Sequence, residues 1–148
     1  MPSKGPIIGR FAGDSIAFVD SSAWLALFSR RDQHHQDADQ MVRKAFASKT
    51  LLLTTSLVLA EIHRLLLFRA GSAAAAAALD RIEASPLVRI VFADATHHQA
   101  ARGWLKKLLA YPISYTDAVS FAVMQQAGCA RALSFDRHFR LAGFASYF

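Results

Sequence analysis

Short apolar runs alternate with helical segments along almost the whole of this 148-residue chain. The runs are rich in aliphatic residues and lack the strict polar–apolar alternation of a strand that faces water on one side. The predicted strands are Ile16–Val19, Leu51–Thr54, Leu87–Phe92 and Ala130–Phe135, with a last short strand near Ala145–Tyr147. Because parallel neighbours need a crossover helix, this order predicts an α/β fold. We expect a three-layer α/β/α sandwich with a central, mainly parallel sheet.

Capping residues and helix breakers set the limits of the segments between these strands. Gly71 breaks one long helix, and Ser72 is placed to cap the next. A capping-box pattern, Thr96 with Gln99, starts another helix. The predicted helices are Ser22–Phe28, His34–Ser48, one capped by Thr55 or Ser56 that runs to Arg69, Ala73–Ala84, one from Thr96 to about Tyr111, and one from Ser114 to Gly128.

Composition limits the chain to one globular domain. Hydrophobic residues make up 53% of it and charged residues 19%, which excludes a disordered chain. No apolar stretch reaches the ~20 residues of a membrane span, so we expect no membrane segment. The single cysteine, Cys129, excludes an internal disulfide, and a cytoplasmic location is expected. Residues 1–14 contain several Gly and Pro and are interpreted as a flexible extension that precedes a domain over residues 15–148.

Four of the eleven acidic residues stand in apolar surroundings. Asp20 follows the first predicted strand and Asp136 ends the fourth, while Glu61 and Asp117 lie within apolar helical segments. A buried carboxylate is unfavourable unless it is paired or bound to a cation. Ligands of parallel sheets bind at the carboxyl ends of the strands, where Asp20 and Asp136 fall. The pattern therefore predicts that these four carboxylates converge on one divalent-metal site.

Each of these acids also has a structural interpretation, which the sequence leaves open. The alternatives are a helix cap at Asp20, a capping box of Ser114 with Asp117, a cap at Asp136 for the turn that begins at Arg137, and an ion pair of Glu61 with Arg64. Asp94 is a fifth candidate ligand, although its place before a helix that starts near Thr96 favours a capping role.

The charge balance favours a polyanionic ligand. The net charge is +6, and the exterior is more basic still if four carboxylates point into one pocket. A basic surface around an acidic pocket suits a nucleic acid that is held by its phosphates while metal ions act on one of them. A solubilising surface would have the same composition. The hard oxygen ligands of such a pocket suit Mg²⁺.

The four segments that carry the acids resemble the four acidic motifs of PIN-domain nucleases. They are Phe18–Ala23, Leu57–Glu61, Tyr115–Val119 and Leu133–Phe139, and they follow the family's order. From about residue 15 to its end, the chain is most similar to VapC-type toxins of toxin–antitoxin pairs. The resemblance implies a Mg²⁺- or Mn²⁺-dependent endoribonuclease on an α/β/α fold, often dimeric and neutralised by a partner antitoxin.

The resemblance also implies roles for individual residues. The metal-binding and catalytic acids would be Asp20, Glu61, Asp117 and Asp136. Ser134 matches a hydroxyl position near the last acid, and Ser21 matches one beside the first. The chain departs from the family pattern in the residues that precede its first strand. It also has His138 where an acid is common.

Other functions fit parts of this pattern. A receiver-like phosphoacceptor domain needs adjacent acids near its first strand and a lysine after its last, and neither is obvious here. A catalytically idle, RNA-binding PIN scaffold typically lacks one or more acids, whereas all four are present. A stand-alone PIN nuclease in RNA processing is the alternative to a toxin.

A run of four apolar residues, Leu65–Phe68, covers most of a helix circumference, and one core contact cannot easily bury all four side chains. It predicts a homodimer with an exposed apolar groove near Ser56–Ser85 that receives an antitoxin segment.

Overall fold

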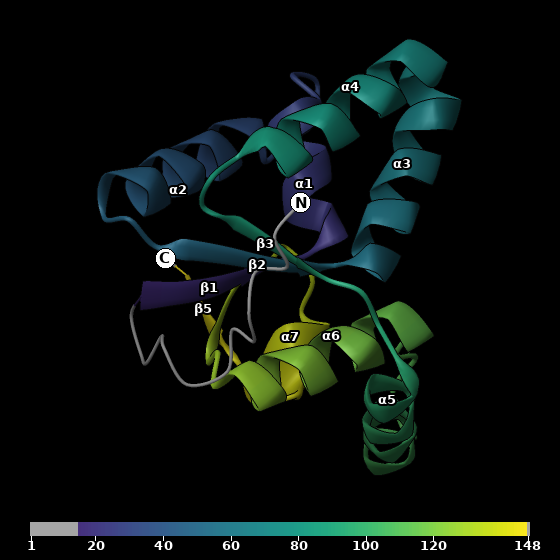
Figure 1. The fold of residues 1–148 in the computed structure, drawn as a ribbon. Helices are drawn as coiled ribbons and strands as arrows, with labels where there is room; N and C mark the ends of the chain where they lie inside the picture. The colour runs from purple at the N-terminus through teal and green to yellow at the C-terminus, as the bar shows by residue number, and fades with distance from the viewer. Residues whose placement is uncertain (1–14, 148) are drawn as a thin grey trace.

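The computed structural model describes residues 15–147, and its elements form three layers (Figure 1). The middle layer is a five-stranded sheet in the order β3-β2-β1-β4-β5. The strands are β1 (Ile16–Val19), β2 (Leu51–Thr55), β3 (Val88–Val91), β4 (Arg131–Leu133) and β5 (Ala145–Ser146). Every neighbouring pair is parallel, which confirms the predicted sheet. The extension predicted over residues 1–14 lies outside the described residues.

Helices cover both faces of the sheet, as the three-layer prediction requires (Figure 1). One face carries α1 to α4, and the other carries α5 to α7. The helices are α1 (Ser21–Phe28), α2 (His35–Ala47), α3 (Ser56–Ala70), α4 (Ser72–Ala84), α5 (Ala95–Lys107), α6 (Tyr115–Ala127) and α7 (His138–Leu141). Among the described residues, none of these helices is long and apolar enough to cross a membrane.

The sequence offered two caps for the start of α5, Asp94 and Thr96, and the structure uses Asp94. Asp94 rather than Thr96 caps the helix, because its carboxylate accepts hydrogen bonds from the backbone N–H groups of Thr96 (2.9 Å) and His97 (3.2 Å). The ring of His97 completes the capping box by accepting a hydrogen bond from the Asp94 N–H (3.1 Å). The sequence pattern favoured Gln99 because a glutamine is the usual partner, whereas here an imidazole fills that role.

Two further helix limits shift by a few residues. Helix α5 ends at Lys107 rather than near Tyr111, because the Tyr111 N–H bonds the Leu108 carbonyl and so forms a turn. Ser72 is the first residue of α4 and not its cap. Gly71 takes the cap position at φ +93°, a conformation that favours glycine, so it ends α3 and starts α4.

The centre of the sheet is anchored immediately before the predicted metal site. All four residues of β1 are buried, since helices cover both of its faces. At its end, the Trp24 ring N–H donates to the Thr54 hydroxyl (3.3 Å), which in turn donates to the Val19 carbonyl (3.0 Å). These bonds join α1, β2 and β1. The chain therefore leaves β1 in a fixed direction, which positions Asp20.

The run Leu65–Phe68 is only partly exposed. Leu66 is buried and its two leucine neighbours are half-buried, while Phe68 is 78% exposed. Helix α3 packs against α1 and α4, which cover more of its surface than the sequence alone suggested. Phe68 is thus the one member of this run left largely in contact with solvent.

Candidate active site

Asp20 lies where strand β1 becomes helix α1, and only 4% of it is exposed. One carboxylate oxygen accepts hydrogen bonds from the Ser22 hydroxyl (2.7 Å) and from the Ala23 N–H (3.1 Å), which caps α1. The other oxygen accepts a hydrogen bond from the Ser134 hydroxyl (2.6 Å). The capping role allowed by the sequence is therefore real, but it uses one oxygen only, and the second is held by a residue 114 positions away.

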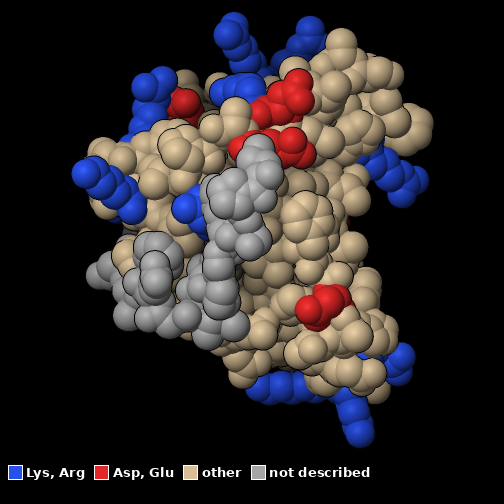
Figure 2. Space-filling view, in the orientation of Figure 1, with Lys and Arg blue, Asp and Glu red and all other residues tan. Residues whose placement is uncertain are grey.

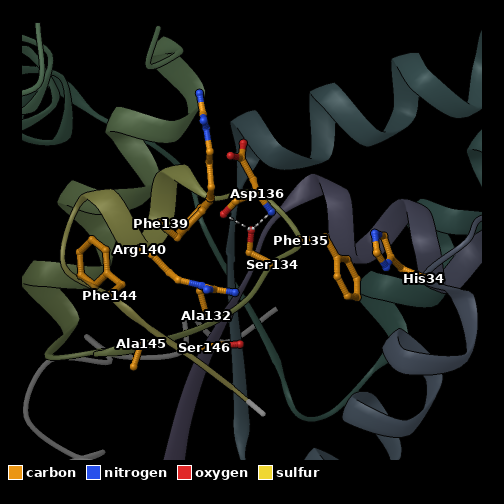
Figure 3. A pocket seen from close by; sticks show the side chains of 11 residues that line it. His34, Ala132, Ser134, Phe135, Asp136, Phe139, Arg140, Phe144, Ala145 and Ser146 are labelled. Carbon is orange, nitrogen blue, oxygen red and sulfur yellow. Dashed lines mark hydrogen bonds between the residues drawn. The ribbon is translucent and has the colours of Figure 1, made fainter. Parts of the chain in front are cut away.

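Serine hydroxyls tie the ends of β1 and β4 together. The Phe135 N–H donates to the hydroxyl of Ser22, which itself donates to Asp20 (2.9 and 2.7 Å). The hydroxyl of Ser134 accepts a hydrogen bond from the Asp136 N–H (3.0 Å), as Figure 3 shows. Ser134 thus contacts both aspartates and fixes the loop after β4 against the start of α1.

Glu61 reaches the same region from helix α3. Its carboxylate accepts a hydrogen bond from the hydroxyl of Ser21 (2.6 Å), the residue next to Asp20. The alternative partner, Arg64, lies over the ring of Phe68 instead (6.0 Å). Of the apolar neighbours of Glu61 along its helix, Val58 and Ile62 are buried and Leu57 and Leu65 are half-buried, as is the glutamate itself.

Asp117 and Asp136 meet around His138. Asp117 stands in the first turn of α6, where its N–H donates to the capping hydroxyl of Ser114 (3.0 Å). The His138 ring nitrogen Nδ1 lies 3.4 Å from an Asp117 oxygen and 3.3 Å from an Asp136 oxygen. The same Asp136 oxygen accepts a hydrogen bond from the His138 N–H (2.9 Å), so Asp136 also stabilises the start of α7.

His138 is the site residue that sequence reasoning missed. One ligand atom each from Asp117, Asp136 and His138 lie within 4.8 Å of one another, close enough to bind one ion. In the sequence, this histidine is conspicuous only as a departure from an acidic position. Its spacing from Asp136 could have indicated this role. A residue two positions after Asp136, in the first turn of a helix, can place its side chain next to the Asp136 carboxylate.

Burial and mutual repulsion disfavour the negative charges of the site. Desolvation is the main reason that the pKa of Asp20 rises from 3.8 to about 7, against the lowering effect of its hydrogen bonds. The pKa of Asp117 rises to about 6, chiefly by desolvation and then by the charge of Asp136. Glu61 repels Asp117 in the same way, and Asp117 repels Asp20. Asp117 thus lies near enough to each of the other three predicted acids for an electrostatic interaction.

This donor set fits a divalent cation. The hydrogen-bond partners of the acids are hydroxyl groups, backbone N–H groups and an imidazole, none of which carries a permanent positive charge. A cation bound between Asp117, Asp136 and His138 would stabilise the ionised carboxylates that burial penalises. Asp94, the fifth candidate, is 65% exposed at its side chain and serves as the α5 cap.

Comparison with known proteins assigns the chain to a family. The PIN domain family model matches residues 17–145. The chain belongs to the PIN-domain family. VapC20 of Mycobacterium tuberculosis, which is named a 23S rRNA-specific endonuclease, is 38% identical to this PIN domain over 128 residues. That match covers 86% of this chain and 94% of VapC20, so the PIN domain described here is of the VapC type.

Solved structures show the same fold. The crystal structure of Mycobacterium tuberculosis VapC20, described as a sarcin–ricin loop cleaving toxin, has a TM-score of 0.78 with 38% identity. The match covers 88% of this chain and 97% of that one. VapBC2 from Rickettsia felis, solved with a DNA fragment from its promoter, has a TM-score of 0.62 and 13% identity, over 88% of this chain and 96% of that one. At that identity, the second match bears on the fold alone.

Proposed function

We propose that this VapC-type PIN domain is an endoribonuclease toxin that uses Mg²⁺ or Mn²⁺. The observation that carries the proposal is the convergence of four carboxylates from four separate elements, in a chain 38% identical to an rRNA endonuclease. An idle RNA-binding scaffold would have no need to keep one buried and one half-buried aspartate, Asp20 and Asp117, whose charge is unfavourable. A metal-dependent nuclease would need them, because Asp117 would help to hold the ion and Asp20 would add negative charge beside it.

The residues of the site would have two kinds of role in hydrolysis, metal binding and positioning of the metal ligands. A bound divalent ion supplies a polarised water and positive charge near the phosphate. Asp117, Asp136 and His138 would hold that ion, with Asp20 and Glu61 completing the negative pocket. Ser134 and Ser21 act as positioning residues, because each donates a hydrogen bond to one of the acids. Direct hydrolysis should leave a 5′-phosphate and a 3′-hydroxyl.

The substrate proposed for this chain is a structured RNA loop, with the sarcin–ricin loop of 23S rRNA as the first candidate. Its support is the name of the relative and the charge of the chain, which is +6 overall. Figure 2 shows Lys and Arg side chains around much of the outline of one face, whereas Asp and Glu occupy a few small areas. Such a distribution suits a polyanion that contacts the protein through its phosphates.

The first prediction concerns the metal. The purified protein, freed of any partner, should cleave a sarcin–ricin stem-loop RNA in Mg²⁺ or Mn²⁺ and should stop when EDTA removes the ion. Restoring Mn²⁺ should restore cleavage, because the carboxylates and His138 are O and N ligands that Mn²⁺ accepts readily. Gel analysis of the end groups provides the measurement. Cleavage that continues undiminished in EDTA would rule out the metal mechanism.

We further propose that an antitoxin protein binds in a groove of about 950 Å³ between the end of α1, α3 and α4, which we call the arginine groove. Its lining includes the apolar residues Leu25, Phe28 and Leu66, three alanines of α4 and four arginines. These are Arg30, Arg31, Arg69 and Arg81. One acid, Asp32, also lines it. The groove therefore suits an amphipathic helix with an apolar face and acidic flanks.

The second prediction tests this partner and the proposed homodimer. Expression of the chain alone should arrest bacterial growth, and co-expression of the small neighbouring gene should restore it. The double variant Arg69→Glu, Arg81→Glu should lose that rescue, because it repels an acidic segment, whereas Arg102→Glu on α5 should keep it.

Light scattering should report a dimer at micromolar concentration. A harmless monomer without a co-purifying partner would favour a stand-alone PIN nuclease.

A further inference from the structure

A second pocket adjoins the candidate active site at the ends of β4 and β5. It has a volume of about 290 Å³, and we call it the strand-end pocket. Figure 3 shows Ser134 and Asp136 between two groups of side chains, with His34 and Phe135 on one side and Arg140 and Ser146 on the other. The pocket thus shares two residues with the proposed catalytic site. Whatever it binds lies beside Ser134 and Asp136.

One side of the strand-end pocket is a flat aromatic wall. The rings of His34 and Phe135 are stacked, with centroids 4.2 Å apart and planes within 4° of parallel. Both residues are only partly buried, although stacked aromatic rings are usually core residues. His34 comes from the loop before α2 and Phe135 from the loop after β4. Aromatic rings held in this way are the surfaces on which proteins stack unpaired RNA bases.

The opposite side of the pocket is suited to an anion. Arg140 is exposed on α7, and its side chain extends into the pocket (Figure 3). The hydroxyl of Ser146 on β5 is buried and has no hydrogen-bond partner among the described residues. A buried hydroxyl without a protein partner remains able to donate a hydrogen bond to a ligand atom that reaches it. A phosphate oxygen would accept hydrogen bonds from both the hydroxyl and the guanidinium.

We propose that the strand-end pocket binds a nucleotide that flanks the scissile phosphate, with its own phosphate on Arg140 and Ser146 and its base against the His34–Phe135 pair. This inference rests on the proposed ribonuclease function and adds to it a subsite that fixes the position of the RNA. Phosphate contacts orient an RNA without reading its sequence, whereas a stacked base must be unpaired. The pocket therefore selects a loop nucleotide beside the cleavage point.

Binding of a sarcin–ricin stem-loop RNA tests the subsite in a chain silenced by Asp117→Asn. In that background, Arg140→Gln should weaken binding and lower the slope of log Kd against log salt by about 1, because one phosphate contact is lost. His34→Leu should weaken binding roughly tenfold, and His34→Phe should keep it, because stacking needs an aromatic ring. Fluorescence anisotropy at several salt concentrations gives these values. Arg102→Gln, an equal charge change on α5, should leave both quantities unchanged.

Cleavage assays on variants that keep Asp117 test the subsite proposal separately from the ribonuclease proposal. With Arg140→Gln, we expect a higher KM and an almost unchanged kcat, since the residue positions the RNA and does not touch the reacting atoms. Thermal melts that match the unmodified protein would show that the variants are folded. If Arg140→Gln and His34→Leu bind and cleave like the unmodified protein, the subsite is wrong and the ribonuclease proposal stands. If the unmodified protein neither binds nor cleaves RNA, both fail.

Discussion

Asp117→Asn and Asp20→Asn should each reduce RNA cleavage by at least about 100-fold, because even a partner that merely orients a metal ligand is worth 10–100-fold. Asparagine keeps the size of the side chain but removes one negative charge from the pocket. Of the two variants, Asp117→Asn should have the larger effect on cleavage, since Asp117 contacts His138 and is repelled by Asp136 and Glu61. Multiple-turnover cleavage of the stem-loop RNA in Mg²⁺ and in Mn²⁺ measures the effect.

Asp94→Asn is the matched control for these two variants. It makes the same chemical change on an acid that caps α5 and is 65% exposed. Asparagine is as good a helix cap as aspartate, so both activity and stability should be almost unchanged. If Asp94→Asn abolished cleavage while Asp136→Asn did not, the assignment of the fourth acid would be wrong and the loop after β4 would lose its proposed role.

His138→Gln refines the same test. Glutamine keeps a polar side chain of similar reach but lacks an imidazole nitrogen. That nitrogen is the one proposed metal ligand of this site that is not a carboxylate oxygen. If His138 holds the ion, the loss should be greater for Mn²⁺ binding than for Mg²⁺ binding, because Mg²⁺ prefers oxygen ligands. Calorimetric titration of each ion into the metal-free protein would show the difference without reference to cleavage.

The fold could be predicted from the sequence because each of its elements is marked locally. Residues such as Ile16–Val19 are buried on both faces of the sheet, so their apolar run is continuous and visible in the sequence. Limits that depend on less common capping partners were not visible in this way. The cap of α5 uses a histidine ring, and the position predicted for Ser72 as a cap is taken by Gly71 in a left-handed conformation.

The candidate site could be predicted in part, because a carboxylate in an apolar segment is conspicuous without any knowledge of its partners. What the sequence could not show is which groups hold those carboxylates. Ser134 bonds Asp20 across 114 positions, and Ser21 bonds Glu61 across 40. His138 and the stacked pair of His34 and Phe135 also depend on contacts between distant elements or on the direction of a loop. Such residues look like ordinary surface positions until the chain is folded.

The metal-free protein should become less stable as the pH rises from about 4 to about 7. The pKa of Asp20 is about 7 in the folded protein against an ordinary value of 3.8, so between these values the folded state binds more protons than the unfolded state. The contribution of protonated Asp20 to the free energy of unfolding is fully present below about pH 4 and is lost as the pH rises to about 7. For Asp117 the same loss ends near pH 6. For Asp20 a pKa shift of this size corresponds to about 4 kcal/mol.

Asp20→Asn should therefore raise the melting temperature of the metal-free protein at pH 8, although the same variant should strongly reduce cleavage. The asparagine oxygen can still accept the hydrogen bond that caps α1, and no charge remains to be desolvated. Since 1 kcal/mol shifts the melting temperature by roughly 3–5 °C in a domain of this size, the gain in EDTA should be several degrees. Calorimetry in EDTA at pH 5 and pH 8 measures it.

With Mn²⁺ added, the unmodified protein should have a higher melting temperature than Asp20→Asn, which is the reverse of the order in EDTA. Binding of the ion to the folded state stabilises the unmodified protein by mass action, whereas Asp20→Asn binds it weakly and gains little. Asp39→Asn provides a control on the exposed surface of α2, where the acid forms an ion pair with Arg43 (2.8 Å), and it should change neither melt by more than a degree or two. If Asp20→Asn were the less stable protein in EDTA at pH 8, the buried carboxylate would be a stabilising cap and helix-anchoring group. Desolvation of that carboxylate would then not destabilise the protein, and the physical reason for expecting a cation there would be lost.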